Sequence, residues 1–135
     1  MTTKIFVNLP VRDLNKSIEF FKRLGYSFNP QFTDETATCM IISEHIYAML
    51  LTHAKFQEFT SRPICDATQC TEVLVCLSCA SRAEVDELVG KAVAAGGKAH
   101  GKQTDYGFMY QHGFEDPDGH IWELIHMDES FVQKG

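Results

Sequence analysis

The sequence lacks any run of about 20 consecutive apolar residues, the length that a membrane-spanning helix requires. Basic residues are also few, because 12 Lys and Arg stand against 18 Asp and Glu and leave a formal net charge of -6. They are scattered singly or in pairs, so no basic patch is available to a phosphate backbone. These absences predict a protein that binds neither a membrane nor nucleic acid.

A signal peptide and a regular cysteine framework are absent as well. The N-terminal segment has no apolar signal core and leads directly into a strand-like segment. The five cysteines are odd in number and irregularly spaced, so we expect reduced thiols and a cytoplasmic protein. Cys76 and Cys79 form a C-x-x-C pair, which could bind zinc or act in redox chemistry. Because Cys76 lies in an apolar β-type run, burial as small apolar residues is the favoured interpretation.

What the sequence does contain is enough apolar material, 44% of 135 residues, for one compact domain. Strand-like and helix-like patterns follow each other in the order strand, helix, strand, strand, strand over about residues 4–52. After a connection over 53–70, which contains Pro63, the same order begins again over about residues 71–128. The sequence therefore predicts a single α+β domain, residues 1–135, built from two tandem β-α-β-β-β modules.

The residue patterns place the individual elements. Asp13 and Gly25 are suited to begin and end the first helix, and Ser81 opens a capping box before the second. The predicted helices cover residues 14–24 and 82–95, and the predicted strands cover 5–11, 26–29, 37–43, 46–52, 72–78, 98–100, 107–115 and 120–127.

Glu123 is the most informative polar residue in this pattern. Side chains alternate between the two faces of a strand, so Glu123 shares a face with Ile121 and Ile125, while Trp122 and Leu124 share the other. An unpaired carboxylate buried between two isoleucines is costly. Glu123 is therefore expected at the solvated mouth of a cavity or bound to a partner.

Three segments resemble the vicinal oxygen chelate superfamily, which includes glyoxalases, extradiol dioxygenases and bleomycin-binding proteins. They are LPVRDLNKSIEFF at 9–21, LGY at 24–26 and FEDPDGHIWEL at 114–124. The resemblance implies that the eight strands form a curved cup with the helices outside. It also implies a small-molecule site in the cup, formed by two modules that pair within one chain or across a dimer. Because such a chain leaves sheet edges and an apolar surface uncovered, we expect a homodimer.

In this superfamily a divalent metal ion is held by residues of the first, fourth, fifth and eighth strands. The matching positions here hold Phe6, Met49, Glu72 and Glu123. Phe6 has no donor atom, and the thioether of Met49 is too soft for Mg, Mn or Fe, so only Glu72 and Glu123 offer oxygen ligands. We therefore expect no tightly bound cofactor and at most a weakly held divalent ion.

The remaining candidates are residues that the pattern places near the cup. Asn8 follows Phe6 on the same face, and Tyr47 shares the parity of the ligand positions; both are predicted to contact a ligand, or else belong to the core. Tyr110 and His112 lie on the seventh strand, where Tyr110 would add to an aromatic wall and His112 would act as a general base. Glu123 is the predicted catalytic residue.

Three functions remain open from the sequence, one of them a structural or regulatory protein that keeps the fold without the chemistry; the other two involve a small-molecule site. One is an enzyme of the glyoxalase (lyase) or extradiol dioxygenase type with an incomplete set of metal ligands. The other is a metal-free protein that binds or sequesters a small molecule, as bleomycin-resistance proteins do. The sequence does not name the substrate.

Overall fold

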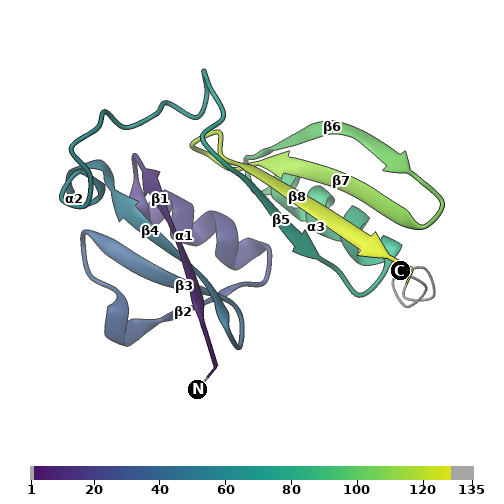
Figure 1. The fold of residues 1–135 in the computed structure, drawn as a ribbon, viewed down its shortest axis with the longest axis horizontal. Helices are drawn as coiled ribbons and strands as arrows, with labels where there is room; N and C mark the ends of the chain where they lie inside the picture. The colour runs from purple at the N-terminus through teal and green to yellow at the C-terminus, as the bar shows by residue number, and fades with distance from the viewer. Residues whose placement is uncertain (1, 129–135) are drawn as a thin grey trace. The chain divides into compact units, whose positions relative to one another are not determined.

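The computed structural model describes residues 2–128 and divides into two units, the first ending at Cys65 and the second beginning at Asp66. Each unit contains one long helix and one four-stranded sheet (Figure 1). The two units repeat the same element order, so the predicted pair of β-α-β-β-β modules is confirmed.

The first unit has the strand order β1-β4-β3-β2. Strand β1 runs parallel to β4, and the other pairs are antiparallel. Its elements are β1 (Ile5–Val11), α1 (Leu14–Arg23), β2 (Ser27–Asn29), a 3-10 turn η1 (Pro30–Phe32), β3 (Ala37–Ser43), β4 (Ile46–Thr52) and the short α2 (His53–Phe56).

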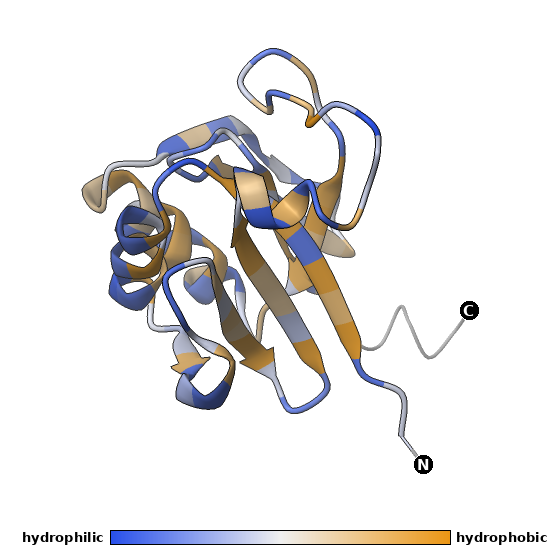
Figure 2. Cartoon of the chain, turned by 90° about the vertical axis from the view of Figure 1, so that its left-hand side faces the viewer, coloured by the Kyte–Doolittle hydropathy of each residue, from blue (hydrophilic) through white to orange (hydrophobic). Residues whose placement is uncertain are grey.

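Helix α1 is amphipathic and covers one face of this sheet. The Asp13 carboxylate accepts a hydrogen bond from Lys16 N at 3.1 Å and so caps the helix, as predicted. Phe20 and Phe21 are buried on its inner side, together with Leu9 of β1 and Leu50 of β4. Figure 2 shows the difference in composition, since β1 and β4 are largely hydrophobic (orange) whereas the helix alternates between polar and apolar residues.

The second unit repeats this arrangement with the order β5-β8-β7-β6, in which β5 runs parallel to β8. Helix α3 packs against β7, β6 and β8, and Val85, Phe114 and Trp122 form the centre of its core. The elements are β5 (Leu74–Ser78), α3 (Arg82–Ala94), β6 (Lys98–Asp105), β7 (Met109–Glu115) and β8 (Ile121–Met127).

Strand β6 differs from the prediction because it runs to Asp105 rather than ending at His100. Its register with β7 shifts between His100, which pairs with Gly113, and Thr104, which pairs with Gln111. Three residues of β6, 101–103, therefore lie opposite the single residue His112 of β7, and Gly101 in the bulge has φ 68°. The polar sequence of this edge strand has no apolar alternation, so the pattern did not reveal its length.

The cysteines also differ from the prediction. Cys65 and Cys70 are disulfide-bonded, whereas Cys39, Cys76 and Cys79 are free, so the expectation of five reduced thiols is wrong. Between the bonded pair, Gln69 N and Cys70 N both donate to Asp66 O, and this tight turn reverses the chain. Cys76 is exposed rather than buried, because it lies on the face of β5 that points away from α3.

Among residues 2–128, no helix is both long enough and apolar enough to cross a membrane.

Candidate functional site

The face of the second sheet that points away from α3 carries Glu123, as the strand alternation predicted. Trp122 and Leu124 are each 1% exposed and lie in the core under α3. Ile121, Glu123 and Ile125 are partly exposed on the opposite side. We call this side the open face of the second unit.

A row of four paired residues crosses the open face at Glu123. Glu123 pairs with Cys76 of β5 on one side and with Gly113 of β7 on the other, and Gly113 pairs with His100 of β6. Residues paired in this way present their side chains on the same face of a sheet. The row thus brings a thiol, a carboxylate, a gap at the glycine and an imidazole into line, and we call it the Gly113 row.

The carboxylate of Glu123 is held by a neighbouring amide. Gln111 Nε2 donates to Glu123 Oε2 at 2.8 Å, and the contact is partly buried. The carboxylate in turn affects Cys76. Partial desolvation of the sulfur, although the residue as a whole is exposed, and after it the charge of Glu123 raise the pKa of the Cys76 thiol. The thiol is therefore protonated at neutral pH and can donate weakly, but it is a poor nucleophile.

A pocket of about 220 Å³ opens beside Glu123 in this unit. Its wall includes Glu123, Gln111 and Gly113 on one side and His100 and Lys102 of β6 on the other. A Cβ atom built on Gly113 would approach Trp122 O to 3.0 Å, so any side chain there would crowd the backbone and fill the floor of the row. The glycine and the bulge in β6 together create the space.

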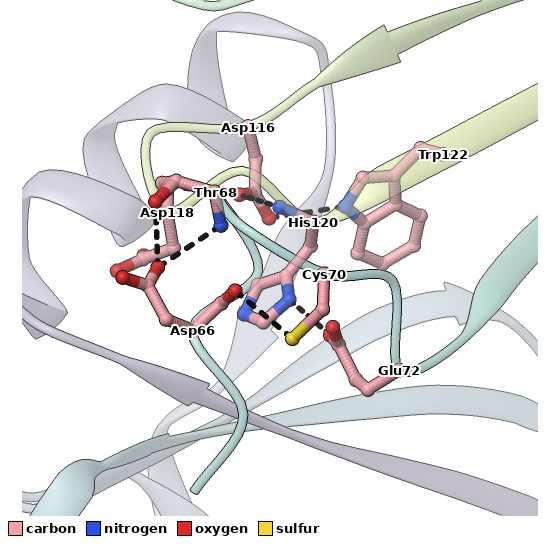
Figure 3. A network of polar contacts seen from close by, with 8 residues as sticks. All are labelled: Asp66, Thr68, Cys70, Glu72, Asp116, Asp118, His120 and Trp122. Carbon is pink, nitrogen blue, oxygen red and sulfur yellow. Dashed lines mark hydrogen bonds and ion pairs between the residues drawn. The ribbon is translucent and has the colours of Figure 1, made fainter.

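Glu72 does not lie with Glu123 but belongs to a separate, partly buried network (Figure 3). It precedes β5 rather than lying on it, and its Oε1 is 2.6 Å from His120 Nδ1. His120 is 3% exposed, and its main-chain N donates to Asp116 Oδ1 at 3.0 Å. His120 therefore helps to hold the Asp116–Gly119 turn.

Asp116 is the centre of that network. Its Oδ1 accepts from the main-chain N of Asp118 and of His120, and its Oδ2 accepts from Trp122 Nε1 at 3.1 Å. Burial nevertheless raises the pKa of Asp116 to about 6, although the charge of His120 and the indole N–H act in the opposite direction. Gly119 closes the turn at φ 88°, with the backbone of Ala67 and Thr68 too close for a Cβ.

In the first unit, the predicted residues share one face of the sheet. Phe6 pairs with Tyr47 and Asn8 pairs with Met49, on the side away from α1. The Phe6 and Tyr47 rings are stacked with centroids 4.9 Å apart, and Phe6 is 49% exposed. These four residues are therefore surface residues of one face rather than core, and none of them carries a charge.

Two predicted residues lie on the face toward α3 and not on the open face. Tyr110 pairs with His126 and donates from its hydroxyl to Asp86 Oδ1 of α3 at 2.6 Å. His112 pairs with the buried Leu124, and its buried Nδ1 has no hydrogen-bond partner among the described residues. His112 borders the pocket only where the bulge separates β6 from β7.

The sequence reasoning missed Gln111, His100 and Cys76 as neighbours of Glu123. Alternation alone places Gln111 on one face of β7 and Tyr110 and His112 on the other. The pairing of Gln111 with Ile125 is needed to show that Gln111 lies on the open face. The predicted strand over 98–100 ends at His100. The position of His100 next to Gly113 depends on the register of β6, which carries no signal in the pattern.

Comparison with known proteins gives consistent results. Residues 3–43 match the family model described as bleomycin resistance protein-like N-terminal. The structure of hypothetical protein SA1046 from S. aureus is 31% identical with a TM-score of 0.78, and the match covers 93% of this chain and 95% of that chain. No match was found among curated proteins.

Two further solved structures share the fold at lower identity. A glyoxalase/bleomycin resistance protein/dioxygenase family enzyme from Burkholderia phytofirmans PsJN is 16% identical with a TM-score of 0.76, covering 93% of this chain and 99% of that chain. A bleomycin-binding protein complexed with bleomycin is 20% identical with a TM-score of 0.65, covering 93% and 98%. This chain belongs to the vicinal oxygen chelate superfamily.

The metal ion implied by the superfamily does not fit the donors of this chain. Glu72 is hydrogen-bonded to the buried His120, and the residue paired with Glu123 on β5 is Cys76, a soft donor whose thiol has a raised pKa. Gln111 already donates to one oxygen of Glu123. Within residues 2–128, no three His, Cys, Asp or Glu side chains are grouped so that they could hold a metal ion.

Proposed function

We propose that this vicinal oxygen chelate protein binds a small organic molecule on its open face without a tightly held metal ion. The observation that carries the proposal is the Glu123 carboxylate, which Gln111 orients at the edge of a pocket. No residue between 2 and 128 other than Gln111 hydrogen-bonds to this carboxylate. Its free acceptor positions are available to an N–H or O–H group of a ligand.

The donor set favours the binding protein over the metal-dependent enzyme. A chelating mechanism needs a filled coordination sphere that acts as a Lewis acid on substrate oxygens. Phe6 and Met49 do not supply hard ligands at the corresponding positions, and Glu72 is hydrogen-bonded to His120. A lyase or dioxygenase activity would therefore have to use Glu123 as a metal-free base.

The proposal is tested by screening a fragment library with two-dimensional amide NMR on labelled protein. Ligands are expected to shift the Gly113 amide and the side-chain amide of Gln111, and Glu123→Gln is expected to reduce these shifts. The mutation keeps the size of the side chain but removes its charge. If the shifts cluster elsewhere, or remain unchanged in Glu123→Gln, the site is misplaced.

The metal content gives a second, independent test. We expect protein purified without added metal or chelator to contain Zn, Ni, Mn or Fe far below one equivalent per chain. Near-stoichiometric metal that is lost in Glu123→Ala would contradict the proposal and support the metalloenzyme instead.

A further inference from the structure

The pocket beside Glu123 carries opposite charges at its two ends. Glu123 lies on β8, while Lys102 and His100 lie on β6. The Gly113 position separates them, and two steps between neighbouring strands of about 4.8 Å each set the backbones about 10 Å apart. The acidic and basic groups therefore face the same pocket without neutralising each other directly.

The polar groups at both ends have capacity for a ligand. At the acidic end, Gln111 occupies one oxygen of Glu123 and leaves the other open. At the basic end, Lys102 forms no ion pair with any residue from 2 to 128. His100 Nδ1 lies 3.6 Å from Glu115 Oε2, and its Nε2 remains for another partner.

We infer that this pocket accepts a small zwitterion with an amino group toward Glu123 and a carboxylate toward Lys102 and His100. The inference rests on the proposed function and specifies the class of ligand for the same site. A volume of about 220 Å³ corresponds to roughly seven water molecules, so the ligand part that enters is small. A purely anionic ligand would be repelled by the Glu123 carboxylate, and a purely cationic ligand would be repelled by the Lys102 ammonium group.

The length of the ligand follows from the geometry of the Gly113 row. Each charged group of the ligand needs about 3 Å to its partner, so a short chain fills the remaining gap better than a single carbon. We therefore expect 4-aminobutanoate to bind better than glycine. Butylamine and butanoate, which match its chain length but carry one charge each, are the controls for charge.

The experiment measures dissociation constants for these four probes by two-dimensional amide NMR on the full chain. We expect 4-aminobutanoate to shift Gly113 and the Gln111 side-chain amide, with butylamine and butanoate binding about three- to tenfold more weakly. Lys102→Gln and Glu123→Gln are each expected to weaken the binding of 4-aminobutanoate by a similar factor. The spectra also show directly whether each variant is folded.

Lys98→Gln is the matched control, because Lys98 lies on the same strand but pairs with Glu115 and does not border the pocket. It should leave binding of 4-aminobutanoate unchanged. Equal affinity for butanoate and 4-aminobutanoate, or equal effects of Lys102→Gln and Lys98→Gln, would overturn the inference. If library fragments shift Gly113 through Glu123 while all zwitterions fail, the ligand class is wrong and the proposed function stands. If no compound shifts the amide signals of the Gly113 row, both the ligand class and the proposed function are wrong.

Discussion

Asp116 shows how burial controls the chemistry of one side chain. It accepts hydrogen bonds from two amides and an indole, yet its pKa is raised from 3.8 to about 6 because the surrounding protein excludes water. The folded state therefore binds a proton more readily than the unfolded state between these values. The contribution of Asp116 to the free energy of unfolding falls as the pH rises from about 4 to about 6, by about 3 kcal/mol in total.

We predict that this pH dependence disappears in Asp116→Asn/Trp122→Phe. The second substitution removes the indole N–H, which would otherwise meet the new amide NH₂. Urea unfolding followed by circular dichroism at pH 4, 5, 6 and 7 measures the difference from the parent protein. Trp122→Phe alone should keep the dependence. Parallel curves for the parent and the double variant would show that Asp116 does not titrate in this range.

At the scale of the elements, two glycines in the second unit have opposite structural roles. Gly113 lies on β7 with Trp122 O 3.0 Å from the position of a Cβ. Gly90 lies inside α3 with nothing within 4 Å of that position. The strand needs its glycine for close packing, whereas the helix has one that only increases the entropy of the unfolded chain.

We therefore expect Gly113→Ala to lower the free energy of unfolding by about 1–3 kcal/mol, since the backbone of β8 must shift. Gly90→Ala should raise it by about 0.4–1 kcal/mol, because alanine favours the helix. Urea unfolding followed by the fluorescence of Trp122 reports on this unit directly. Equal effects of the two substitutions would contradict the close approach of β7 and β8.

At the scale of the whole molecule, the edge strands leave apolar side chains exposed. Ile5 and Phe6 of β1 are 53% and 49% exposed, and Leu74 of β5 is 53% exposed. Edge strands with apolar side chains tend to pair with another chain unless they are covered. A homodimer, expected from the sequence, would cover such surfaces.

We predict a solution mass near twice the 15.2 kDa of one chain at micromolar concentration. Light scattering after size-exclusion chromatography measures it. Ile5→Lys/Leu74→Lys should shift the mass toward one chain, whereas Phe59→Lys, at an exposed residue outside the sheets, should not. A parent protein with the mass of one chain would contradict the dimer.

Local residue patterns were sufficient to predict the two modules and the face of Glu123. Alternation in β8 and the caps of α1 and α3 are local, because they depend on residues within a few positions of each other. The correct prediction of Phe6, Asn8, Tyr47 and Met49 on one face has the same origin. The match to the superfamily rests on motifs of the same local kind.

The identity of the side chains that surround Glu123 depends on long-range packing. Its neighbours Gly113 and Cys76 come from strands distant in the sequence, and their positions depend on pairing register. The bulge in β6 shifts His100 and Lys102 toward the pocket, and the loop before β5 places Glu72 on His120 instead of on the open face. Register, bulges and loop paths are set by long-range packing, so a local sequence pattern does not predict them.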